Sequence, residues 1–184
     1  LANGHQLQLS TFAHLKKRMP LTSSDANANH AVLEDSNGRL WYALRNQIHA
    51  VATISHPQHI TITLPLNAAG TEITAMFQDG AGIIWIGTMG NGIWLADPAS
   101  GQVKQMQRID KLMQANVLSM SGRGDEIWIS SLEGVFHGTL QSPVDNDNWP
   151  MYQLAGMSDV NTIGTSYIYQ IFMDSKRRVW FATD

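Results

Sequence analysis

Residues 79–97 read DGAGIIWIGTMGNGIWLAD, and this stretch decides the fold of the chain. It holds two apolar, β-prone runs, and the residues between them, Met89–Gly92, have the composition of a hairpin turn. In the first run Ile84 and Ile86 lie on one face of the expected strand and Trp85 on the other. Since both faces are apolar, the pattern predicts a strand buried between two neighbouring sheets.

The same stretch recurs along the chain. Four tryptophans, each within a β-prone segment, stand 44, 43 and 52 residues apart: Trp41, Trp85, Trp128 and Trp180. An aspartate precedes three of them by six residues: Asp35, Asp79 and Asp174. The third copy, MSGRGDEIW, lacks this aspartate. A fixed period of this length indicates a repeat architecture.

Each copy predicts four short antiparallel strands. An apolar run and the tryptophan run form a hairpin, a second turn leads to a third strand, and a fourth run closes the unit. A four-stranded unit of this length is typical of β-propeller blades. We therefore predict an all-β fold, a β-propeller of four-stranded antiparallel blades. A parallel β-helix is the structural rival, but its coils are shorter and would not need glycine hairpins.

The copies begin and end out of phase with the chain. Residues 1–28 are predicted to end a preceding blade, 29–71, 72–115 and 116–160 to form three blades, and 161–184 to start another. A small closed ring and an open arc are the two alternatives. We favour a partial arc of a larger ring of about seven blades. Because an arc exposes a sheet face at each end, we expect it to pair with another copy or to aggregate.

Composition excludes several classes of function. The chain of 184 residues contains no cysteine, so thiol nucleophiles, disulfides and thiolate metal sites are excluded. Its net charge of −3 and low content of charged residues give no electrostatic footprint for nucleic acid. No apolar stretch could span a bilayer, so we expect no direct membrane insertion. Since the chain opens at Leu1, we expect it to be part of a longer protein.

The repeat resembles the two-component regulator propeller family. The matching positions lie in the second copy: Phe77, Asp79, Gly82, Trp85, Gly87, Thr88, Gly92 and Trp94. The other copies fit more loosely, with Ala43 and Leu44 in place of the glycine and threonine, and Arg177 in place of the turn glycine. The resemblance implies an extracytoplasmic, periplasmic sensor region of a membrane-bound bacterial regulator, such as a hybrid histidine kinase or a diguanylate cyclase.

Three motifs suggest chemistry, and a structural interpretation is favoured for each. His56 and His59 have metal-like spacing, but Pro57 prevents a helix, so we expect a surface loop. Asp145 and Asp147 begin like a calcium loop, yet the glycine and the closing glutamate that it needs are absent. The segment GTMGNG lacks a following helix N-terminus and is expected to be a hairpin turn, not a phosphate site.

No catalytic residue, metal site or cofactor is predicted. A ligand would meet the face where the turns between second and third strands approach the segments that link blades. The candidates are Arg45, Asn46, Met89, Asn91 and Glu133. The expected partners are a small molecule or an oligosaccharide, neighbouring domains of the same protein, and a second copy in a homodimer. A soluble scaffold for protein partners and a propeller lyase or hydrolase are the alternative functions.

Overall fold

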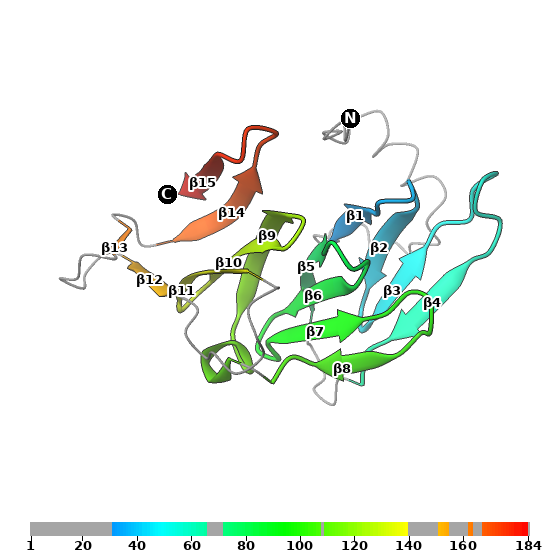
Figure 1. Cartoon of the computed structure of the whole chain (residues 1–184). Helices are drawn as coiled ribbons and strands as arrows, with labels where there is room; N and C mark the ends of the chain where they lie inside the picture. Colours follow the sequence, from blue (N-terminus) through cyan, green and yellow to red (C-terminus); the bar gives the residue numbers. More distant parts are fainter. Residues whose placement is uncertain are drawn as a thin grey trace.

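The structure, a computed structural model, describes residues 31–65, 72–107, 109–139, 151–154, 162–163 and 167–183. Within them the chain forms successive β-sheets arranged one after another along an arc (Figure 1). Residues 1–28, predicted to end a preceding blade, lie outside the described residues, as do Asp145 and Asp147.

The first two sheets each have four antiparallel strands in chain order. The first contains β1 (Val32–Glu34), β2 (Leu40–Leu44), β3 (Gln47–Ala50) and β4 (Ile60–Thr63). The second contains β5 (Ile73–Gln78), β6 (Ile84–Thr88), β7 (Ile93–Ala96) and β8 (Val103–Gln105). Most of these strands are joined by short turns with turn-forming residues such as Asp35, Gly82 and Gly90, whereas residues 51–59 separate β3 from β4.

The third sheet has the same plan with one addition. A short 3-10 helix, η2 (Asp110–Leu112), precedes it. Its strands are β9 (Val117–Arg123), β10 (Glu126–Ser131), β11 (Gly134–Thr139), β12 (Met151–Leu154) and β13 (Thr162–Ile163). The last strand, β13, pairs with β12 in parallel and extends the sheet at its edge. A final hairpin consists of β14 (Ile168–Met173) and β15 (Val179–Thr183).

The first strands of successive sheets lie next to one another: β1 beside β5, β5 beside β9, and β9 beside β14. Hydroxyl side chains join the second and third of these pairs. Thr74 donates to the Val117 carbonyl at 2.6 Å, and Ser119 and Ser121 accept the amides of Ile171 and Met173 at 3.1 and 2.9 Å. Antiparallel four-stranded sheets with adjacent inner strands are the architecture of a β-propeller, and the described residues form a partial arc of one.

We call the contact between two successive sheets a seam. Ile84 and Ile86 of β6 are fully buried in the first seam, against the first sheet. Trp85 points to the other face and is buried in the second seam, against the third sheet. The prediction that this strand is buried on both faces is therefore confirmed.

In the first, second and fourth repeats the aspartate and the tryptophan are bonded to each other. Asp35 Oδ1 accepts the amides of Asn37 and Arg39 at 3.0 and 2.8 Å, and its Oδ2 accepts the indole Nε1–H of Trp41 at 2.9 Å. Asp79 and Asp174 repeat this arrangement with Trp85 and Trp180. The spacing of six residues is thus explained, because one carboxylate closes the turn and orients the tryptophan that packs in the seam.

The tryptophans differ in exposure according to what covers them. Trp41 is 0% exposed and Trp85 is 6% exposed, because the next sheet packs on each. Trp180 is 54% exposed, and Phe172, opposite it on β14, is 56% exposed. The final hairpin therefore presents to solvent the aromatic face that the earlier repeats bury.

Candidate functional site

The turns between second and third strands gather at one end of the sheets, which we call the turn face. There they are bonded to the segments that link successive sheets. Met89 N donates to Glu72 O at 3.0 Å, Gly92 N to Ala115 O at 3.2 Å, and Leu132 N to Asn116 O at 3.1 Å. The meeting of turns and linkers expected from the repeat is present in the structure.

The five candidate residues lie on this turn face in different environments. Arg45 is exposed and has a φ of 56°, a left-handed conformation that is uncommon for a residue with a Cβ. Asn46 uses its amide to donate to the Leu64 carbonyl at 3.1 Å. Met89 is 38% exposed. The backbone carbonyl of Asn91 accepts Trp94 Nε1 at 3.1 Å, which orders its turn.

Asn116 joins the second and third of these turns. Its Nδ2 donates to Glu133 Oε1 at 3.1 Å, and its Oδ1 lies 3.7 Å from the position that a Cβ of Gly90 would take. The structure thus brings Glu133 close to the turn of Met89 and Gly90, whereas Asn46 is bonded to Leu64 within its own repeat. Sequence analysis missed Asn116, although a polar residue directly before the buried start of β9 is a usable signal.

The histidine pair singled out in the sequence does not form a site. His56 contacts Ser55, as expected for a loop. His59 instead approaches His49 of β3, with ring centroids 5.6 Å apart, and His49 stacks on Tyr42 at 5.0 Å. Burial lowers the pKa of His49, and the neighbouring His59 lowers it further. Among the described residues no group of three or more potential ligands could hold a metal ion.

His49 leads to a prediction about pH. Because its folded-state pKa is lowered, the neutral form stabilises the fold above the unfolded value of about 6.5, and this contribution is lost as the pH falls below it. We expect the melting temperature to drop between about pH 7.5 and pH 5.5, and to drop less in His49→Gln. Thermal unfolding at both pH values measures this difference. An equal drop in both proteins would assign the effect to other groups.

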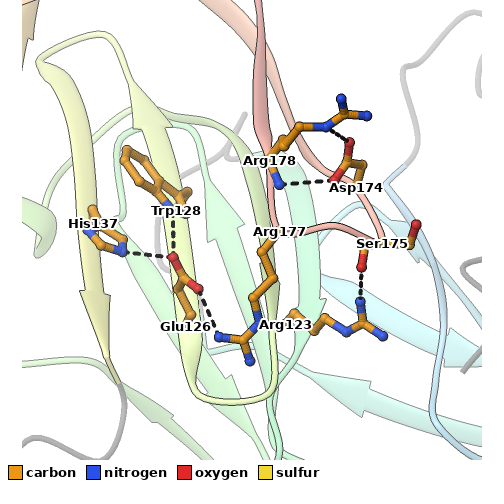
Figure 2. Close-up of polar contacts among 8 residues, drawn as sticks. All are labelled: Arg123, Glu126, Trp128, His137, Asp174, Ser175, Arg177 and Arg178. Carbon is orange, nitrogen blue, oxygen red and sulfur yellow. Dashed lines mark hydrogen bonds and ion pairs between the residues drawn. The ribbon is translucent and has the colours of Figure 1, made fainter.

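At the opposite end of the sheets a second group of polar residues spans the third seam (Figure 2). Glu126 Oε1 accepts Trp128 Nε1 at 3.3 Å and His137 Nε2 at 3.2 Å, and the Trp128 and His137 rings stack at 4.1 Å. Glu126 Oε2 lies 3.7 Å from Arg177 Nη1. Arg123 Nη1 donates to the Ser175 carbonyl at 2.8 Å.

Asp174 belongs to the same end and is bound within its own hairpin. Burial acts to raise its pKa, but hydrogen bonds from Arg178, Trp180 and the Lys176 amide outweigh burial and hold the pKa well below its usual range. The Arg178 Nε to Asp174 Oδ2 distance is 2.7 Å. This carboxylate therefore stays charged at neutral pH and holds its turn closed.

The sequence of the chain was compared with known protein families and with curated proteins. The sequence model described as "two component regulator propeller" matches residues 68–90. No curated protein matches the chain in sequence. Among the residues described, no helix has both the length and the apolar character needed to cross a membrane.

Several solved structures are similar to the chain. The extracellular domain of the putative hybrid two component system BT4673 from B. thetaiotaomicron gives a TM-score of 0.61 at 18% identity, covering 83% of this chain and 20% of that one. The corresponding domain of BT3049 from the same organism gives 0.57 at 19% identity, covering 83% and 18%. Virginiamycin B lyase from Staphylococcus aureus gives 0.60 at 14% identity, covering 90% and 51%.

These likenesses place the chain in the class of β-propellers. The chain spans about a fifth of the length of the two-component domains and about half of the length of the lyase. Within that class it carries the two component regulator propeller repeat, so the resemblance seen in the sequence is confirmed. Propellers with this fold include both extracellular domains of two-component systems and lyases.

Proposed function

We propose that the chain is part of the periplasmic sensor region of a membrane-bound bacterial signal-transduction protein, and that it binds a ligand without catalysis. The observation that supports this most is the two component regulator propeller repeat within an arc of blades similar to extracellular domains of two-component systems. A histidine kinase or a diguanylate cyclase would provide the output. Binding would act by shifting the relative stability of two arrangements of the sensor.

The ligand site that we propose is the turn face. Arg45, Asn46, Met89, Asn91 and Glu133 lie there, and Asn116 holds two of the turns together. A guanidinium, a carboxylate and amides on ordered turns suit a ligand rich in hydroxyl groups, such as an oligosaccharide or a polar small molecule. Arg45 fits this role because strained backbone conformations are concentrated at functional sites.

The parent reading frame tests the sensor proposal directly. A signal peptide, further repeats, a membrane span and a kinase or cyclase domain in the same frame would support it. A frame with neither a membrane span nor an output domain would contradict it and leave a soluble scaffold, for which pull-down of a stable protein partner is the positive result.

A thermal-shift screen with defined oligosaccharides tests the ligand site. Any compound that raises the melting temperature is retested on Arg45→Ala and Glu133→Gln, with Lys176→Met as the control at the opposite end of the sheets. We expect the two turn-face variants to lose the shift and the control to keep it. A shift that survives in both turn-face variants would place binding elsewhere on the protein.

A lyase is the second candidate function. The fold is similar to a lyase of which it covers about half. At one end of the sheets Glu126 and His137 provide acid–base groups, and Arg177 provides a fixed positive charge. Because a solved lyase contains quinupristin, that compound is the substrate to test first. Loss of quinupristin in the presence of the wild-type chain, but not of His137→Ala, would favour the enzyme over the sensor.

A further inference from the structure

Two departures from the repeat, far apart in the sequence, meet in the structure. The third copy lacks the aspartate that binds the tryptophan, and the fourth has Arg177 where the turn glycines Gly38 and Gly82 stand. Glu126 takes the place of the missing aspartate, and its second carboxylate oxygen lies 3.7 Å from Arg177 Nη1 across the third seam (Figure 2). The two departures therefore bring opposite charges together from different repeats.

Glu126 stands where it does because the third hairpin is short. Arg123 and Glu126 pair directly, so β9 and β10 are joined by two residues and the turn has no room for the usual aspartate. The Glu126 carboxylate binds Trp128 and His137 through one oxygen. Its other oxygen remains directed toward the neighbouring hairpin, so a bond that is local in the other repeats becomes a link between repeats.

Arg177 occupies a backbone conformation that favours glycine. Its φ is 61°, close to the 74° and 87° of Gly38 and Gly82 in the same turn position. A side chain with a Cβ is disfavoured there, and such strain persists only where the surroundings stabilise it. The arginine gains a carboxylate partner, Glu126 of the third sheet, which a glycine could not reach.

Polar contacts cross the third seam beside its apolar packing. Among the described residues, the first and second seams bury large apolar clusters that include Trp41, Ile48 and Ile86, or Phe77, Trp85 and Ile129. In the described part of the third seam, Val135, Ile168 and Ile171 are buried, and Trp128, Val179 and Phe181 pack against them partly buried. Polar contacts from Arg123, Ser119 and Ser121 supply the remaining links.

We propose that Glu126 and Arg177 form a charged latch, and that ionic strength controls how readily the third seam opens. The charged or titratable groups around the latch are Arg123, Asp125, His137, Asp174, Lys176 and Arg178. The Arg177 side chain is 65% exposed, so dissolved salt reaches the pair and screens it. Apolar seams are not weakened by screening.

Hydrogen–deuterium exchange of the 184-residue chain tests the latch, with Glu126→Gln, Arg177→Met and the double variant. Gln keeps an acceptor for Trp128 and His137, and Met keeps the length of Arg177 without its charge. At low salt, about 20 mM, we expect the amides of β14 and β15 to exchange about 2–5-fold faster in each single variant than in the wild type. The double variant should exchange no faster than either single variant, because each of them has already lost the ion pair. Near 0.5 M salt the wild type should reach the exchange rates of the variants, because the Debye length is then only a few ångströms and the ion pair is screened.

Lys176→Met is the matched control, because it removes a cation from the same turn without touching Glu126. We expect its exchange rates to equal those of the wild type. Additive effects of the two latch variants, or exchange of β14 and β15 that does not change with salt, would overturn the proposal. If Glu126→Gln loses its β-sheet signal in circular dichroism, Arg177→Met decides the question alone, because removing an exposed charge leaves no cavity.

Discussion

Replacing Gly92 by alanine is expected to lower the free energy of unfolding by about 3 kcal/mol or more. A Cβ at this position would overlap the carbonyl oxygen of Leu112 and stand 2.5 Å from that of Met113, both in the segment that links the second and third sheets. The φ of 62° adds the cost of a left-handed conformation. The linker would have to move, and with it the buried side chain of Leu112 in the second seam.

Gly90→Ala separates these two causes. Gly90 has a φ of 82°, yet the nearest atom to its added Cβ is Asn116 Oδ1 at 3.7 Å, an ordinary contact. This control should therefore lose only the conformational part, about 1 kcal/mol. Urea unfolding followed by tryptophan fluorescence measures both variants. Equal losses would mean that the close approach of the linker to Gly92 contributes nothing to stability.

Asp35→Ala is expected to lower the free energy of unfolding by about 3 kcal/mol. The carboxylate is 8% exposed and accepts three hydrogen bonds, one of them from the indole of Trp41, which is 0% exposed. Without it, a buried indole N–H loses its partner in the first seam, where water does not reach it. Urea unfolding followed by tryptophan fluorescence measures the loss.

Asp174→Ala is the natural comparison, because this carboxylate makes the same bonds to its turn and to Trp180. Trp180 is 54% exposed, so water can replace the lost acceptor. We expect a clearly smaller loss than for Asp35→Ala, confined to β14 and β15. Equal losses in the two variants would show that the turn, and not the buried indole, accounts for the effect.

The third and fourth repeats show where local sequence reasoning ended. Both departures were visible as differences from the repeat, one as a missing aspartate and the other as Arg177 in place of a glycine. That they are partners could not be deduced, because the contact of Glu126 with Arg177 depends on how one sheet is placed against the next. The contact of His49 with His59 was missed for another reason, because it depends on the register in which β3 pairs with β4. The metal-like spacing of His56 and His59 led to no site.

The candidate ligand residues illustrate the same division. The repeat predicted that the second turn of each sheet would meet the linkers, and those contacts are present. The role of Asn116 depends on a side chain that reaches from a linker to Glu133 and lies beside Gly90. Binding at this face remains a proposal that the thermal-shift experiment tests.

The sequence by itself determined the repeat, the four-stranded antiparallel unit, and the burial of Ile84, Trp85 and Ile86, because these follow from short-range periodicity and turn chemistry. Only the tertiary structure decided that opposite charges meet across the third seam, and which side chains meet at each end of the sheets. Such contacts join residues from different repeats, and their geometry is set by the packing of whole sheets, which no local pattern encodes.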